Sequence, residues 1–320
     1  MAPHLKAEER AVLAQRVAAR VSKAAIAREL HRDRRTIDRE LRRNSIASIY
    51  CPVQAQKLSE RRRRQGRAKC RKMARPENLA YVQEGLRAYW SPDQIAGRSR
   101  RDFPQDRQRH LSRQLVYNWL KSHDHRQPLL AFLRRGGKKR QRRPQPHAGP
   151  QAVANRPAIV NTRGRDGDWE GDTIVGPGSA VLANMTERRS GFLVLLPVAT
   201  RKAQAVRQAL CGRLTQFPAA MRLTATFDNG REFLETKALE SALGLKVFYT
   251  RPGSPWQRGS IENLNGLIRQ FFPKGTNFRQ ESRYRVAQIE QLLNDRPRKR
   301  LSYQTPSENF QQQCQRAIQT

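Results

Sequence analysis

The order of strand-like and helix-like segments after residue 163 is the feature that most limits the possible folds. Three segments rich in apolar and β-branched residues come first, separated by turn residues: 168–175, 179–187 and 192–198. Helical and strand periodicity then alternate over 201–214, 222–227, 231–244, 246–250 and 259–272. The resulting order, β-β-β-α-β-α-β-α, predicts an α/β domain with a mixed five-stranded sheet and helices on its faces.

The first 44 residues are typical of an all-α structure. Apolar residues mark a first helix beginning near Leu5, and Ser22 is placed to cap a second helix that carries Ile26 and Leu30 on one face. After a short turn, a third helix exposes five arginines: Arg34, Arg35, Arg39, Arg42 and Arg43. Two short helices, a tight turn and an arginine-rich second helix predict a helix-turn-helix that binds DNA. An ordinary helical bundle with a solvated basic face is the alternative.

The charge of the chain favours a polyanionic partner. Its 320 residues include 63 basic and 27 acidic side chains, a net charge of +36, and residues 1–150 alone carry +25. Self-repulsion on this scale destabilises a compact protein, so we expect nucleic acid as the partner. No apolar run is long enough for a membrane span, and the first ten residues lack the apolar core of a signal peptide. We therefore expect a cytoplasmic, nucleoid-associated protein without a membrane partner.

Composition divides the chain into five parts. The second part contains the run "RRRRQGRAKCRK", and the fourth is rich in Gly, Pro and basic residues. The third begins its helices with Ser91-Pro92, a capping pattern, and continues with helical spacing over 111–120. The expected parts are a helix-turn-helix domain at 1–48, a basic linker segment at 49–75, a second helix-turn-helix-like domain at 76–125, a basic linker at 126–162, and the α/β domain at 163–320.

Three carboxylates of the α/β domain are placed to carry chemistry. Asp172 lies in the first strand and Asp228 just beyond the fourth. If these strands pair in parallel, the two side chains converge at one rim of the sheet, and Glu262 begins a helix that could pack across that rim. Three such carboxylates can hold two Mg²⁺ ions, because hard cations prefer oxygen ligands. Two metal ions stabilise the attacking and leaving oxygens of a phosphodiester displacement.

Spacing alone does not select these acids from their neighbours. By alternation, Asp168, Glu170 and Asp172 share one face of the first strand. Asp166 is also near, and Glu232 follows Asp228 closely, although its position is more typical of an acid in the first turn of a helix. The residues alone therefore leave the choice open.

Four stretches resemble the insertion sequence 30 family of bacterial transposases. They are "DWEGDTIVG", "TFDNGREF", "FYTRPGSPWQRGSIENLNGLIRQFFPKGT" and "LNDRPRKRLSYQTPSE", which together cover about 165–308, and "IAREL" and "ELRRN" near the N-terminus also match. The resemblance implies an RNase H-like catalytic domain of the DDE type. Its metal-binding catalytic residues would be Asp172, Asp228 and Glu262, with two ions of Mg²⁺ or Mn²⁺.

The resemblance also implies an activity and its partners. A DNA transposase would bind the inverted-repeat ends of its element as double-stranded DNA, cleave a strand there and transfer it to a target, as a homodimer or higher oligomer. Two alternatives stay open: a DNA-binding regulator with an inactive catalytic domain, and a nuclease of the same fold.

Some basic residues and one acid are harder to interpret. Arg258 could contact phosphate or be solvated, and "RPRKR" at 296–300 is either a phosphate contact or a solvated charge run. Asp38 stands in the recognition helix where the family usually has a serine. An acid there would repel phosphate or select cytosine amines.

Overall fold

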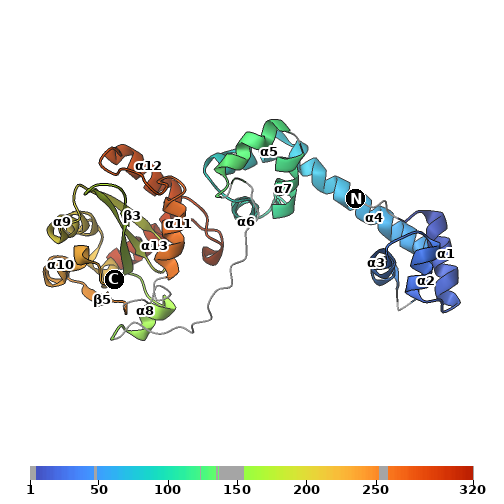
Figure 1. Cartoon of the computed structure of the whole chain (residues 1–320), viewed down its shortest axis with the longest axis horizontal. Helices are drawn as coiled ribbons and strands as arrows, with labels where there is room; N and C mark the ends of the chain where they lie inside the picture. Colours follow the sequence, from blue (N-terminus) through green and yellow to red (C-terminus); the bar gives the residue numbers. More distant parts are fainter. Residues whose placement is uncertain are drawn as a thin grey trace. The chain divides into compact units, whose positions relative to one another are not determined.

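The computed structural model describes residues 5–46, 49–122, 124–134, 136, 155–251 and 259–319 (Figure 1). The chain divides into two compact units, Met1–Leu79 and Ala80–Thr320. No helix among the described residues is both long and apolar enough to cross a membrane.

The first unit is helical, as its sequence predicts. It contains α1 (Ala7–Ala18), α2 (Lys23–Glu29), α3 (Arg34–Asn44) and α4 (Pro52–Arg71). Ser22 caps α2 by accepting a 3.3 Å hydrogen bond from the Ala25 N–H, and Asp33 caps α3 in the same way. Leu13, Ile26 and Ile37 are fully buried and hold the first three helices together.

The segment 49–75 is largely helical, where the sequence led us to expect a basic linker. Ala55 is fully buried and Ser59, one turn later, is nearly so, while Tyr50 joins the same apolar cluster. The beginning of α4 therefore packs into the core of the first unit. A run of arginines does not oppose this, because arginine has a high intrinsic helix propensity.

The second unit begins with helices. α5 (Pro76–Arg87) crosses the boundary between the units and is followed by α6 (Pro92–Asp102), α7 (Arg113–Lys121) and a 3₁₀ helix (Asp124–Phe132). Ser91 caps α6 as expected, and together with Gln94 it forms a capping box. The connection between α6 and α7, residues 103–112, is longer than the turn of a helix-turn-helix. Of the expected linker at 126–162, the described part includes the end of the 3₁₀ helix and α8 (Ala158–Thr162).

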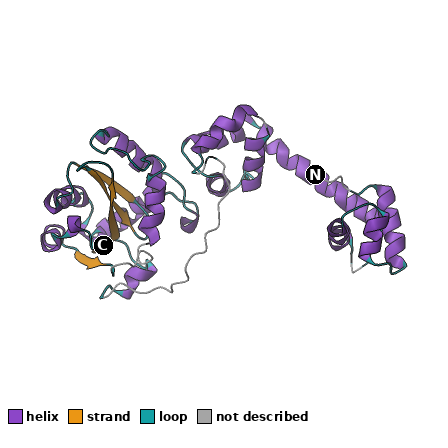
Figure 2. Cartoon of the chain, viewed as in Figure 1, coloured by secondary structure: helices purple, strands orange, loops and turns teal. Residues whose placement is uncertain are grey.

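A five-stranded sheet forms the centre of the second unit (Figure 2). Its strands lie in the order β3 (Leu193–Val198), β2 (Val181–Glu187), β1 (Asp168–Val175), β4 (Thr224–Phe227) and β5 (Lys246–Tyr249). β1, β2 and β3 are antiparallel neighbours, whereas β4 is parallel to both β1 and β5. The element order and the mixed sheet confirm the predicted RNase H-like α/β fold.

The two faces of the sheet are covered by different helices. One apolar cluster joins Trp169, Met185 and Phe227 to α9 (Ala203–Leu214), α10 (Thr236–Leu243) and α13 (Pro306–Gln319). The other joins Ile174 and Leu182 to α11 (Gly259–Ile268) and α12 (Arg283–Asn294). Figure 1 shows α9 and α10 on one side of the sheet and α11 and α12 on the other. Alternation along each strand produces these two faces.

The face toward α11 is apolar over only part of its area. Toward the start of β1 it carries polar side chains instead: Asp168, Glu170 and Asp172 of β1, Asn184 and Thr186 of β2, and Thr224 and Thr226 of β4. We call these seven residues the polar half of the sheet face. Asp168 and Glu170 are fully buried there. Because buried polar groups are costly unless they are paired, this region is the place to look for a functional site.

Candidate active site and nucleic-acid interface

Asp172 lies within β1, and Asp228 directly follows the end of the parallel neighbour β4. Glu170 of β1 is level with Thr226 of β4, so the same register, continued by two residues, sets Asp172 beside Asp228. Gly171 supports this continuation, since a Cβ there would overlap the Phe227 ring and come within 2.6 Å of the Met185 sulfur. Both aspartates are half-buried. Neighbouring strands are about 4.8 Å apart, which places the carboxylates within reach of a common ligand.

Helix α11 holds the Asp172 carboxylate in place. The Asn265 side-chain amide donates a 2.7 Å hydrogen bond to Asp172 Oδ2, and the Thr173 N–H donates a 2.8 Å bond to Oδ1. Leu264, Leu267 and Ile268 anchor α11 on the apolar part of the same sheet face. The contact between strand and helix therefore rests on a packed core, which fixes the orientation of the carboxylate.

Glu262 lies one helical turn before Asn265 on α11 and is exposed. Side chains three residues apart share a side of a helix, so Glu262 is on the side that faces Asp172. Within the part of the chain that the structure describes, no three His, Cys, Asp or Glu side chains are close enough together to hold one metal ion. The structure thus brings Asp172 and Asp228 together and places Glu262 near them, outside a closed cluster.

Glu232 is nearer to the two aspartates than the sequence suggests. Its carboxylate accepts a 2.5 Å hydrogen bond from the Thr173 hydroxyl. Both Glu232 Oε2 and Asp228 Oδ1 are 2.9 Å from the position that a Cβ on Gly230 would take. The continuous helix expected over 231–244 is interrupted: Arg231–Phe233 is a 3₁₀ turn, and α10 starts only at Thr236. Glu232 is therefore an acid beside the site rather than one at the start of α10.

Asp168 and Glu170 have their own cationic partners. Asp168 is paired with Arg165 at 3.0 Å and accepts a 2.7 Å bond from the Thr224 hydroxyl. Glu170 forms an ion pair with Arg188, and both side chains are buried. Burial, followed by repulsion from neighbouring arginines, lowers the pKa of Arg188 to about 9. These two acids are thus paired with arginines, Arg165 partly exposed and Arg188 buried, a distinction that strand alternation could not provide.

Asn184 is a polar residue of this site that the sequence analysis missed. It lies opposite Asp172 in the β1–β2 register and is 1% exposed. Neither its amide nitrogen nor its amide oxygen has a hydrogen-bond partner among the described residues. An asparagine inside the otherwise apolar segment "VLANM" was the available signal.

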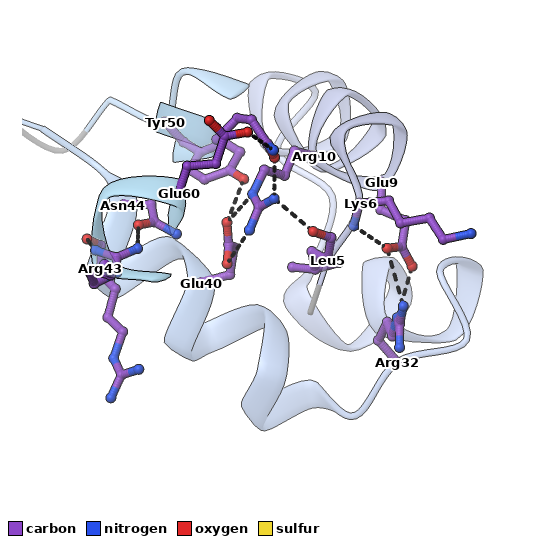
Figure 3. Close-up of polar contacts among 12 residues, drawn as sticks. Leu5, Lys6, Glu9, Arg10, Arg32, Glu40, Arg43, Asn44, Tyr50 and Glu60 are labelled. Atoms are coloured by element: carbon purple, nitrogen blue, oxygen red, sulfur yellow. Dashed lines mark hydrogen bonds and ion pairs between the residues drawn. The ribbon is translucent and has the colours of Figure 1, made fainter. Parts of the chain in front are cut away.

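The five arginines of α3 named as DNA-binding candidates, Arg34, Arg35, Arg39, Arg42 and Arg43, are all exposed. A buried ion pair behind them fixes the helix. Arg10 of α1 is 1% exposed, and its Nε donates a 2.7 Å bond to Glu40 of α3. Another Arg10 nitrogen donates to the Leu5 carbonyl at 2.7 Å, as Figure 3 shows. This pair orients α3 with its arginines toward solvent, and no local pattern indicated it.

Asp38 of α3 is neutralised within the protein. Its carboxylate is 2.6 Å from Lys23 Nζ of α2, and this lysine lowers the pKa of Asp38. The acid is therefore part of the α2–α3 contact and not an isolated negative charge on the recognition helix. Arg258 lies outside the described residues, so its role as a DNA contact stays a prediction.

Comparisons with known proteins give the family. Residues 2–44 match the sequence model of a helix-turn-helix domain. The chain is 35% identical to the transposase for insertion sequence element IS1086 of Cupriavidus metallidurans over 94% of its length and 92% of the relative. It is 32% identical to the transposase for IS4351 of Bacteroides fragilis (98% and 97%) and to transposase InsI for IS30C of Escherichia coli (95% and 82%). The chain belongs to the insertion sequence 30 family of transposases.

The transposase also resembles a solved structure. A crystal structure of the catalytic core domain of BIV integrase is similar over 46% of this chain and 95% of that one, at 17% identity and a TM-score of 0.37. The predicted helix-turn-helix and the predicted family are both confirmed by the sequence matches.

The buried Glu170–Arg188 pair predicts a stability effect in this transposase. Glu170→Gln removes the charge that balances a buried guanidinium, so we expect the free energy of unfolding to fall by about 3–5 kcal/mol. Glu235→Gln is the control, because Glu235 and its partner Arg207 are both partly exposed, and the expected loss is about 1 kcal/mol or less. Urea unfolding followed by tryptophan fluorescence measures both. Equal, small losses in the two variants would contradict the assigned role of Glu170.

Proposed function

We propose that this transposase binds the ends of its insertion sequence, cleaves a DNA strand there and transfers that strand to another site. The observation that carries the proposal is the pair of carboxylates on two neighbouring parallel strands, Asp172 within β1 and Asp228 directly after β4. α11 supplies Asn265 to orient the first of them and Glu262 one turn away. The relatives, each a transposase of an insertion sequence, support the same activity.

The donor atoms of this site suit a hard divalent cation. All three candidate side chains offer carboxylate oxygens, which Mg²⁺ and Mn²⁺ prefer, and the site lies at a rim of the sheet that is only partly buried. Asp172, Asp228 and Glu262 would hold two such ions. When bound, the ions would activate a nucleophile and stabilise the charge on the attacking and leaving oxygens.

The protein itself contributes position. The Asn265 amide occupies Asp172 Oδ2 and the Thr173 N–H occupies Oδ1, so the carboxylate cannot rotate freely. Such locked ligands keep a reactive geometry that a flexible side chain would lose. Glu262 is exposed on α11 and would complete the site when DNA and metal are present.

The proposed chemistry consists of two displacements at phosphorus. In the first, the oxygen of a water molecule forms a new P–O bond as the bond to the 3′-oxygen breaks, and that oxygen leaves as a hydroxyl. In the second, the freed 3′-hydroxyl attacks another phosphodiester and forms a new P–O bond, while the bond to the 3′-oxygen of the target strand breaks and that oxygen leaves as a hydroxyl. No bond to the protein forms in either step.

End recognition is assigned to the first unit. The exposed arginines lie on α3, a helix that is capped and rigidly held. In helix-turn-helix proteins the helix at this position enters the major groove. An element has two ends, so assembly of a homodimer or higher oligomer on double-stranded DNA is part of the proposal.

The first prediction of this proposal concerns the glutamate. Glu262→Gln keeps the shape of the side chain but removes its charge, so we expect nicking and joining of end DNA to be abolished while end binding persists. Asp172→Asn and Asp228→Asn should be equally severe, and the double variants hardly worse, because residues that act as a unit are not additive. Nicking of labelled end DNA and gel shifts on the same preparations provide the two measurements.

Glu232→Gln is the matched control for this series, since Glu232 is the other acid near Asp228. We expect it to retain substantial nicking. Near-normal nicking by Glu262→Gln, with loss in Glu232→Gln, would show that Glu232 is the third carboxylate. If every variant and the parent bind end DNA but never nick it, the protein is a regulator.

The second prediction concerns α3. Arg39→Gln should weaken binding of end DNA; if Arg39 contacts a phosphate, the slope of log K against log salt should fall by about 0.9. If it contacts a base instead, affinity for the cognate end should fall by about 5- to 150-fold with little change in non-specific binding. Fluorescence anisotropy across a salt series distinguishes these results. Arg20→Gln, an exposed arginine between α1 and α2, is the control. Equal effects of both substitutions would remove α3 from the interface.

A further inference from the structure

A basic cavity of about 350 Å³ opens beside the second turn of α11. This volume is within the usual range of ligand sites. Its lining includes five cationic side chains and one asparagine: Arg163, Arg188, Arg298, Lys299, Arg300 and Asn263. We call it the arginine cavity. No part of the proposed chemistry described above uses it.

The arginine cavity adjoins the candidate active site along two elements. On α11, Asn263 directly follows Glu262. On the sheet, Thr186 lines the cavity and is two residues from Asn184, which lies opposite Asp172. Two residues of a strand span about 7 Å, so the cavity begins roughly one strand repeat from the carboxylates. A linear polymer at the aspartates would therefore pass close to it.

Basic side chains outnumber acidic ones in the lining of the cavity. Glu187 is the one acidic residue that lines it among the described residues, and its carboxylate accepts bonds from the N–H groups of Ser190, at 2.6 Å, and Arg189, at 3.1 Å. Glu170 forms an ion pair with Arg188, one of the five cationic residues of the lining. Burial and then repulsion from neighbouring arginines lower the pKa of Arg298 to about 9. An anionic ligand would relieve this repulsion.

Three residues of the run at 296–300, namely Arg298, Lys299 and Arg300, line the cavity, and hydrogen bonds hold the arginines of the run in place. Arg296 is 4% exposed and its Nε donates to Gln94 Oε1 at 3.0 Å. Arg298 donates to the Leu293 carbonyl at 3.1 Å, and Arg300 donates to the Arg189 carbonyl. Backbone carbonyls thus hold these guanidinium groups without neutralising them. Lys299 lies between them and is exposed, free to meet a ligand at the mouth.

We infer that the arginine cavity binds an internucleotide phosphate of the DNA strand that runs through the candidate active site. The inference rests on the proposed function, because the neighbouring carboxylates are what make DNA the source of the phosphate. Arginine and lysine clusters bind phosphate through charge-assisted hydrogen bonds. The contact would set the register of the strand, so that a neighbouring phosphodiester lies at Asp172 and Asp228. The cavity residues are positioning residues in this account.

A binding experiment with the full chain tests the inference without requiring catalysis. The test variant is Arg163→Gln with Lys299→Gln, since neither side chain is fully buried. The matched control is Lys237→Gln with Arg279→Gln, which removes two exposed charges outside the cavity. Each protein is titrated, in excess chelator, with end duplexes that carry one neutral methylphosphonate linkage at successive positions near the element's end. Thermal unfolding checks that each variant is folded.

The parent and the control variant should bind about tenfold more weakly when one particular linkage is neutral. The test variant should bind all the duplexes alike, and its salt slope should fall by up to about 1.8. A parent that is indifferent to every neutral linkage, or a test variant with the same profile as the parent, overturns the inference. If the parent shows the linkage effect but never nicks DNA with Mg²⁺, the cavity assignment holds and the proposed catalytic function fails.

Discussion

The parallel pairing of β1 with β4 is the constraint on which the candidate site depends. The register pairs Glu170 with Thr226, so Asp228, the first residue after β4, follows the end of the strand beside the one that carries Asp172. The buried polar side chains of this sheet face need hydrogen-bond or ion-pair partners, because the rest of the face is an apolar core. Arg165 and Arg188 meet this requirement for Asp168 and Glu170. Asp172 and Asp228 are half-buried at the rim of the sheet and are the acids that we propose for chemistry.

The division of one sheet face into an apolar part and a polar half also explains the role of α11. Its leucines and isoleucine bury against the apolar part, and the same helix then extends over the polar half, where Asn265 reaches Asp172. Glu262 and Asn263 precede Asn265 on the same helix. Glu262 is on the side of the carboxylates, and Asn263 lines the arginine cavity. One packed helix thus fixes both the candidate catalytic group and the proposed strand-positioning contact.

Local patterns predicted the elements well, and contacts between distant segments account for what they missed. Alternation and turn residues indicated all five strands, and the cap at Ser22 was visible in the sequence. The residues alone did not separate Asp172 from Glu170, and only the family resemblance selected Asp172; the ion pair between Glu170 and Arg188 that distinguishes them appears only in the folded chain. The helix α4 was missed because its arginine run was interpreted as part of a linker, although Ala55, which precedes the run, is buried in the core. The Arg10–Glu40 pair joins two helices, so no single segment contained its signal.

The central claim is that Asp172, Asp228 and Glu262 form one metal site on this fold. Anomalous diffraction from Mn²⁺ in crystals of the full chain bound to its end DNA tests that claim most directly. The account predicts manganese peaks coordinated by both aspartates and by Glu262, with Glu170 still paired to Arg188. Peaks coordinated by Glu232 in place of Glu262, or ordered DNA at the aspartates with no manganese there, would contradict it.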